Sequence, residues 1–138
     1  MHGSINNREL VDWLLQEFAI DHIVNFAAES HVDNSLKNPE LFTKTNVLGT
    51  QVLLDAAYQA NVQKFVQIST DEVYGTMAPG QAAKETDPLH PSSPYAASKA
   101  GADMLAMAMV HTLACQSALR AARTTLALVS IMKNYCPC

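Results

Sequence analysis

Two adjacent carboxylates stand where an apolar run of the sequence ends. Residues 66–75 read VQISTDEVYG, so that Asp71 and Glu72 follow Ser69 and Thr70 directly. Taken alone, such a pair favours a structural role as caps of the next turn, because polar side chains satisfy exposed backbone N–H groups there. Two carboxyl groups at one place can also supply a general acid and a general base to a single substrate. Neighbouring motifs have to decide between these roles.

A tyrosine and a lysine form a second candidate pair. Residues 93–104 read SPYAASKAGADM, and Pro94 is typical of a first helical turn, which places Tyr95 and Lys99 one turn apart on one helix face. A neighbouring ammonium favours the phenolate and would lower the pKa of Tyr95, making it a usable base. The motif Tyr-x-x-x-Lys alone is weak and also occurs on ordinary surface helices. Its position about 25 residues after a strand that ends in Ser-Thr makes it much stronger.

Helices and strands alternate around these residues. Apolar spacing predicts helices over residues 7–18, 40–60 and 94–109 and strands over 22–28 and 64–69. Both strands have apolar residues at consecutive positions, which is typical of strands covered on both faces. Strands separated by long helices predict an α/β fold with a doubly wound parallel sheet. Ligands of such sheets bind at the carboxyl ends of the strands, where the Asp-Glu pair is expected.

Composition narrows the possible classes of protein. The chain has 138 residues, 49% of them hydrophobic, which is enough for one core, and its formal net charge of −4 argues against nucleic acid as a partner. No apolar run is long enough to span a bilayer and the first residues do not resemble a signal peptide, so a cytoplasmic protein is expected. The cysteines, Cys115, Cys136 and Cys138, indicate neither a disulfide framework nor a zinc site, and no metal is predicted.

Four blocks of the sequence occur in an order and spacing that match one family. They are residues 25–36 (NFAAESHVDNSL), 45–50 (TNVLGT), 67–75 (QISTDEVYG) and 92–104 (SSPYAASKAGADM). Together they resemble the nucleotide-sugar 4,6-dehydratases of the extended short-chain dehydrogenase/reductases, and the resemblance covers about residues 2–111. The Asp-Glu pair after Ser-Thr favours this group over sugar epimerases of the same superfamily. The resemblance implies a partial NAD-binding domain of Rossmann type and, usually, a homodimer.

The resemblance also implies a mechanism on a nucleotide-sugar substrate, with dTDP-glucose favoured and UDP- or CDP-glucose as alternatives. Tyr95 would take the proton of the sugar 4-hydroxyl while hydride passes to NAD, with Lys99 holding the phenolate and the cofactor ribose. Glu72 would then remove the C5 proton while Asp71 donates to the departing 6-hydroxyl, and hydride returns to C6. Thr70 would bind the 4-oxygen.

The same resemblance assigns binding residues. Those expected to contact NAD are Ser4, Ile5, Phe26, Ala27, Ala28, Glu29, Ser30, Thr45, Asn46, Ser69, Tyr95 and Lys99. Ser30 and Thr70 are expected to contact the substrate. Ala27 and Ala28 could simply be core residues of a strand, but in the family their small size lets the dinucleotide lie against the backbone. A metal or acid–base role for Glu29 with His31 is not favoured, because no further ligands accompany them.

One departure from the family pattern concerns the pyrophosphate. The family holds it on a Gly-x-x-Gly-x-x-Gly turn, whereas here Gly3 stands alone and Ser4 replaces an acidic residue expected near adenine. We therefore expect a partial sheet that lacks the family's first strands and its Gly-rich turn. The chain itself is then expected to be inactive. The alternative function is a non-catalytic fragment or interaction module that shares the dimer interface of a full-length homologue through helices 40–60 and 94–109.

The second departure lies near the C-terminus. Residues 113–138 show neither a clear helix nor a clear strand of the expected type. Moving each codon boundary back by one base permits the translation FGLPVSTTRGSNNFGPRQYHEKLLPL, which closely matches the family's next segment. We therefore expect residues 1–112 to form the partial NAD-binding domain and residues 113–138 to be an out-of-frame tail.

Overall fold

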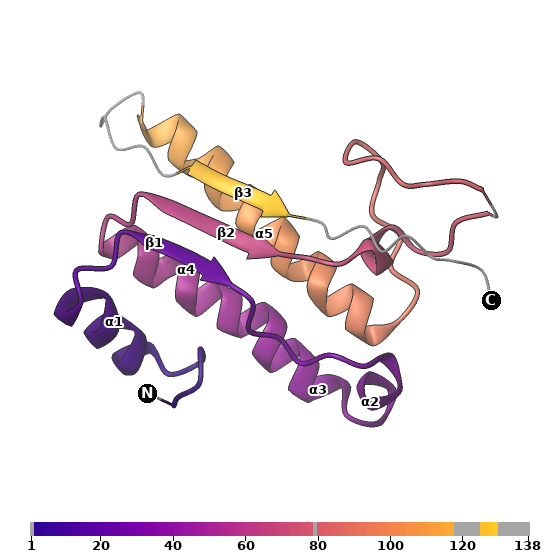
Figure 1. Ribbon diagram of the computed structural model, residues 1–138, viewed down its shortest axis with the longest axis horizontal. Helices are drawn as coiled ribbons and strands as arrows, with labels where there is room; N and C mark the ends of the chain where they lie inside the picture. The colour runs from indigo at the N-terminus through magenta and orange to yellow at the C-terminus, as the bar shows by residue number, and fades with distance from the viewer. Residues whose placement is uncertain (1, 79, 118–124, 130–138) are drawn as a thin grey trace.

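Three parallel strands form the sheet of the protein (Figure 1). The computed structural model describes residues 2–78, 80–117 and 125–129. Strand β1 is His22–Asn25, β2 is Lys64–Ile68 and β3 is Thr125–Val129, in the order β1-β2-β3. Lys64 lies opposite His22 on one side and Thr125 on the other. The predicted α/β class and parallel pairing are therefore confirmed.

One helix precedes β1, and the others occupy the connections between the strands. They are α1 (Arg8–Glu17), α2 (Val32–Lys37), α3 (Pro39–Phe42), the π-helical turn η1 (Thr43–Leu48), α4 (Gly49–Gln59), the 3₁₀ turn η2 (Asp71–Tyr74) and α5 (Pro94–Ser117). The segment from α3 through η1 to α4 corresponds to the helix predicted over 40–60, whereas α2 was not predicted. Across the described ranges, no helix combines the length and apolar character needed to cross a membrane.

The segment after residue 112 contains more regular structure than its sequence suggested. Helix α5 continues to Ser117, and Thr125–Val129 pairs in parallel with β2. The sequence of β3, TLALV, consists of apolar and β-branched residues that suit a pleated sheet. The other residues beyond 117 lie outside the described part of the chain, so the out-of-frame tail stays a prediction.

The helices cover one face of the sheet. Phe65 of β2 is fully buried in a core formed with α1, α4 and α5. On the opposite face, Val24 is 51% exposed and Phe26, just after β1, is 70% exposed. Successive residues of a strand point to opposite faces, so this difference marks the two sides of the sheet. The expectation that both faces are covered is wrong for the described residues, because their long helices all pack on the same side.

The apolar core joins the three long helices to the strands. Its buried members are Val11, Leu15, Leu53, Leu54, Ala56, Ala57, Val62, Phe65 and Ala106. Small residues let α5 approach η1 closely, since a Cβ atom on Gly101 would lie 3.3 Å from Cγ2 of Val47. This packing holds α5 against the helical segment that precedes α4.

A buried amide connects three separate parts of the chain. Asn46 Oδ1 accepts a hydrogen bond from the Glu29 N–H (2.8 Å), and Asn46 Nδ2 donates to the Glu29 carbonyl (3.1 Å) and to Ser98 Oγ (2.8 Å). Ser98 Oγ in turn donates to the Tyr95 carbonyl (2.7 Å). Asn46 therefore fixes the loop after β1 and the first turns of α5 against the π-helical turn η1.

A second set of buried polar groups supports the same region. Asn25 Nδ2 donates to Gln67 Oε1 (2.9 Å) and to Thr50 Oγ1 (3.3 Å), and the Thr50 hydroxyl donates to the Asn46 carbonyl (2.7 Å). Asn25 Oδ1 accepts from the Ala27 N–H (3.1 Å), which turns the backbone away from β1. This bond explains why the strand ends at Asn25 rather than at residue 28 as predicted. Turns of π-helix often occur at functional sites.

Replacing Asn46 with alanine should destabilise the chain by about 2 kcal/mol, because the partly buried backbone groups of Glu29 and the buried hydroxyl of Ser98 lose a partner. Asn38→Ala provides the matched control, since Asn38 is exposed and only caps α3 through the Leu41 N–H. That cap should contribute about 1 kcal/mol or less. Urea unfolding measures both losses, and hydrogen exchange at the Glu29 amide should accelerate only in Asn46→Ala. Equal losses in the two variants would contradict this role of Asn46.

Candidate active site

The acidic pair lies at the carboxyl end of β2, in the turn η2. Thr70 precedes the turn in an extended conformation, and its hydroxyl oxygen accepts from the Glu72 N–H (3.4 Å). The Thr70 hydroxyl also lies 3.3 Å from Asp71 Oδ1, to which it donates. The cap of this turn is thus Thr70, and the Glu72 side chain is exposed. The capping role considered for Asp71 and Glu72 is therefore performed by Thr70.

The turn ends at a glycine whose conformation is required. Gly75 has φ of +80°, and a Cβ atom there would lie 2.3 Å from the His90 carbonyl oxygen. The His90 N–H donates to the Val73 carbonyl (3.0 Å), so the chain returns to η2 before α5 begins. The intervening loop therefore starts and finishes beside the acidic pair.

Tyr95 lies in the first turn of α5 and faces this pair. Its ring packs edge-on against the buried Phe42, with ring centroids 6.3 Å apart. Burial raises the pKa of Tyr95, a hydrogen bond with the Thr70 side chain opposes this rise, and the charges of Glu72 and Asp71 add to it. The predicted lowering of the Tyr95 pKa is wrong for this structure, because burial and nearby carboxylates outweigh the favourable hydrogen bond.

Lys99, one turn further along α5, is buried and points to the end of β2. Its Nζ donates to the Ile68 carbonyl oxygen at 2.5 Å. Burial lowers the pKa of Lys99, and the charge of Asp103 opposes this effect. Lys99 therefore anchors the strand end to α5 in this structure, in addition to the role beside Tyr95 that was predicted for it.

Asp103 is a buried acid that the sequence analysis did not single out. Its Oδ2 accepts a hydrogen bond from Ser69 Oγ, and its side chain is 0% exposed. Burial raises the pKa of Asp103 to about 6, while the Ser69 hydrogen bond and the charge of Lys99 act in the opposite direction. The signal that could have revealed it is its spacing, since Asp103 follows Lys99 by four residues and shares its helix face.

The predicted NAD-binding residues divide into two groups. Phe26, Ala27, Ala28, Glu29 and Ser30 form the loop at the carboxyl end of β1, and Asn46 ties this loop to the helix of Tyr95. Ala27 and Ala28 are exposed, and their small side chains leave the backbone accessible, as close contact with a dinucleotide requires. Thr45 is half-buried in η1, next to Asn46, which holds this loop. These residues fit a cofactor that lies across the strand ends.

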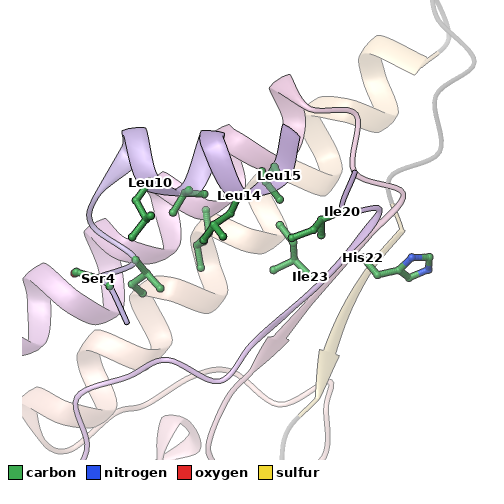
Figure 2. Close-up of a pocket in the computed structure, with 11 residues that line it drawn as sticks. Ser4, Leu10, Leu14, Leu15, Ile20, His22 and Ile23 are labelled. Atoms are coloured by element: carbon green, nitrogen blue, oxygen red, sulfur yellow. The ribbon is translucent and has the colours of Figure 1, made fainter. Parts of the chain in front are cut away.

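Ser4 and Ile5 belong to a separate, mostly apolar pocket of about 340 Å³. The pocket lies between the start of the chain, α1, β1 and α4, and Figure 2 shows Ser4 and His22 at its opposite ends. Ile5 also packs against the start of α4, since a Cβ atom on Gly49 would lie 2.5 Å from Ile5 Cδ1. The hydrogen bonds that join the other predicted residues do not include these two.

Comparisons with known proteins connect this arrangement to one family. The sequence pattern of GDP-mannose 4,6-dehydratase matches residues 1–121. The chain is 57% identical over 105 residues to the low-salt glycan biosynthesis protein Agl12 of Haloferax volcanii, covering 76% of this chain and 33% of that protein. It is 52% identical over 112 residues to dTDP-glucose 4,6-dehydratase of Streptomyces antibioticus, covering 81% of this chain and 32% of the relative.

A solved structure shares the fold. The dTDP-glucose 4,6-dehydratase DesIV from Streptomyces venezuelae, crystallised with NAD bound, superposes with a TM-score of 0.83 at 43% identity, covering 94% of this chain and 37% of that one. The chain thus spans about a third of the length of the curated relatives it matches. With its parallel sheet, its Ser-Thr-Asp-Glu strand end and its Tyr-x-x-x-Lys helix, the chain belongs to the GDP-mannose 4,6-dehydratase family of extended short-chain dehydrogenase/reductases.

Proposed function

We propose that this chain carries the catalytic residues of an NAD-dependent nucleotide-sugar 4,6-dehydratase. The observation that supports this most directly is that the Tyr95 phenol lies close enough to Thr70, Glu72 and Asp71 for all three to affect its pKa. A phenol, a hydroxyl and two carboxyl groups at one strand end supply the acids and bases that oxidation and elimination on one sugar require. A structural turn alone would not need this combination.

The proposed chemistry assigns one task to each side chain. NAD, when bound, accepts hydride during oxidation at C4 and returns it at C6. Tyr95 accepts the proton of the 4-hydroxyl, and because burial raises its pKa, it needs the positive charge of Lys99 to do so at neutral pH. Glu72 removes the C5 proton, while Asp71 in its protonated form donates to the departing 6-hydroxyl. The products are water and a 4-keto-6-deoxy sugar.

The loop at the end of β1 is the proposed place of NAD. Ala27 and Ala28 would lie under the dinucleotide, and Glu29, whose backbone Asn46 holds, would keep the loop in place. Ser30 is the proposed further contact of this loop with cofactor or substrate, and Ser69 with the nicotinamide. Among substrates we favour dTDP-glucose, because relatives at 52% and 57% identity are named dTDP-glucose 4,6-dehydratase.

A second proposal concerns self-association. The helices α3 to α5 expose large apolar side chains, including Leu48 at 55%, Met104 at 58% and Met107 at 38%. Such side chains on adjacent helices support an interface between two copies of the chain. This is the surface through which a non-catalytic product would associate with a full-length homologue.

The out-of-frame origin of residues 113–138 is also a proposal. It is supported by the translation available one base earlier, and the DNA sequence tests it directly. An intact family segment in the shifted frame would support the proposal, and codons that cannot encode that segment would overturn it.

Activity can be tested in a chimera in which residues 1–112 replace the matching segment of DesIV. Conversion of dTDP-glucose to the 4-keto-6-deoxy sugar is expected, and comparison with UDP- and CDP-glucose identifies the nucleotide. Tyr95→Phe should abolish the first oxidation. Asp71→Asn and Glu72→Gln should slow elimination by about 10²- to 10⁴-fold, because both residues act after the ketone forms. Reduced cofactor should still accumulate in these variants, as measured by the near-ultraviolet absorbance that NADH has and NAD lacks.

The matched control for the carboxylate variants is Glu17→Gln, an exposed glutamate at the end of α1, which should leave the rate unchanged. Near-normal dehydration in both Asp71→Asn and Glu72→Gln would contradict their roles. In the same series, calorimetry should show much weaker NAD binding to the 138-residue chain than to the chimera, because the chain contains no Gly-rich turn.

Self-association can be tested by introducing a charge into the proposed interface. Met104→Glu should weaken the dimer at least tenfold in sedimentation equilibrium, because an unpaired carboxylate would be buried. Met77→Glu is the control, since Met77 is similarly placed at the surface, at 37% exposed, but lies in the loop after η2. A wild-type chain that stays monomeric at high concentration, or an equal effect of both changes, would contradict the proposed surface.

A further inference from the structure

Two side chains of α5 hold two consecutive residues at the end of β2. Lys99 Nζ donates to the Ile68 carbonyl at 2.5 Å, and Asp103 Oδ2 accepts from Ser69 Oγ. Lys99 and Asp103 lie one helical turn apart on the same face, and the side chains of Ser69, Lys99 and Asp103 are all buried. We call Ile68, Ser69, Lys99 and Asp103 the strand–helix clamp. Thr70, at the start of the acidic turn, follows it directly.

The clamp is not arranged for maximal stability. Among the described residues, Asp103 Oδ1 is the one buried side-chain oxygen or nitrogen without a hydrogen-bond partner. The pKa of Asp103 is raised from 3.8 to about 6, so the folded chain binds its proton more tightly than the unfolded chain does. The resulting stabilisation is present below pH 3.8 and is lost as the pH rises through about 6. At neutral pH the ionised carboxylate therefore costs stability.

A buried carboxylate one helical turn from a buried ammonium has an electrostatic effect that packing does not have. Opposite charges favour each other's ionised forms, and burial reduces the screening of their interaction by water. The titratable groups that interact with Asp103 are Lys99 and Tyr95 on α5 and Tyr74 on η2. Lys99 is the cation in this set, and its burial works against its charge.

We propose that Asp103 is a positioning residue: its carboxylate keeps Lys99 protonated beside Tyr95 and, through Ser69, fixes the strand end that carries Thr70. The inference rests on the proposed function, because the value of a protonated Lys99 lies in stabilising the Tyr95 phenolate. Asp103 itself acts through Lys99 and Ser69 and is assigned no contact with substrate.

The decisive measurement is an NMR titration of the Lys99 side-chain amine in the 138-residue chain, which needs neither NAD nor sugar. In Asp103→Asn the amide oxygen can still accept from Ser69, but the negative charge is gone. Lys99 should then lose its proton at a pH lower by roughly one unit. If Asp103 were only structural, loosening would expose Lys99 to water and raise its pKa toward 10.5. An unchanged or raised Lys99 pKa therefore overturns the proposal.

Two further variants complete the test. Asp12→Asn is the control, because Asp12 pairs with Arg8 on the surface of α1 and should leave the Lys99 titration unchanged. Ser69→Ala keeps the Asp103 charge but removes its hydrogen bond, so the carboxyl of Asp103 should titrate above its wild-type value of about 6. If Asp103→Asn does not fold, the Asp103 titrations of the wild-type chain and of Ser69→Ala decide. The proposal is overturned if Asp103 titrates near 3.8 in the wild-type chain, or if its titration is the same in Ser69→Ala.

The chimera links the clamp to the reaction. Asp103→Asn should lower kcat with little change in KM and should move the acidic limb of the pH profile, on which Tyr95 must lose its proton to act as a base. A chimera without dehydratase activity would refute the proposed function while leaving the Lys99 titration interpretable. An active chimera whose Asp103→Asn variant keeps the wild-type kcat and pH profile would refute the positioning role alone.

Discussion

The amide of Asn46 is the interaction on which the arrangement of the site most depends. It binds the backbone of Glu29, 17 residues earlier in the chain, and the hydroxyl of Ser98, 52 residues later. A buried amide without these partners would be costly, so the loop after β1, η1 and α5 can move only together. Hydrogen bonds are directional, whereas apolar packing is not. The relative position of the proposed NAD loop and of Tyr95 is therefore fixed by polar contacts.

Polar and apolar interactions occupy different ends of the sheet. Toward the amino ends of the strands, Phe65 packs among apolar residues of α1, α4 and α5. Toward the carboxyl ends, the buried side chains are polar, as Gln67, Ser69 and Asp103 illustrate. Burial of polar groups is tolerated where they are hydrogen-bonded, but each adds a constraint on geometry. Apolar packing near the amino ends of the strands thus supplies stability, whereas hydrogen bonds near their carboxyl ends fix the positions of the side chains.

Sequence patterns predicted the elements of this fold better than their surroundings. The strand over 64–69 and the parallel α/β order were confirmed. Both rest on local signals, since apolar residues mark the strand and Pro94 marks the start of the following helix. What covers a strand is not local, which is why Val24 was expected to be buried and is exposed. The same limit applies to the direction of the Tyr95 pKa shift, which depends on burial and on distant carboxylates. Asp103 was missed because its hydrogen-bond partner, Ser69, lies 34 residues away in the chain, although its spacing from Lys99 is a local signal.

The loop that follows η2 is closed where Gly75 meets His90, so changes within the loop need not displace η2 or α5. The His90 N–H donates to the Val73 carbonyl, and Gly75 lies against the His90 carbonyl. The two ends of the loop therefore meet whatever lies between them. Lengthening a loop whose ends are already joined adds little entropic cost. Insertions and substitutions between residues 76 and 89 can therefore accumulate while η2 and α5 keep their places.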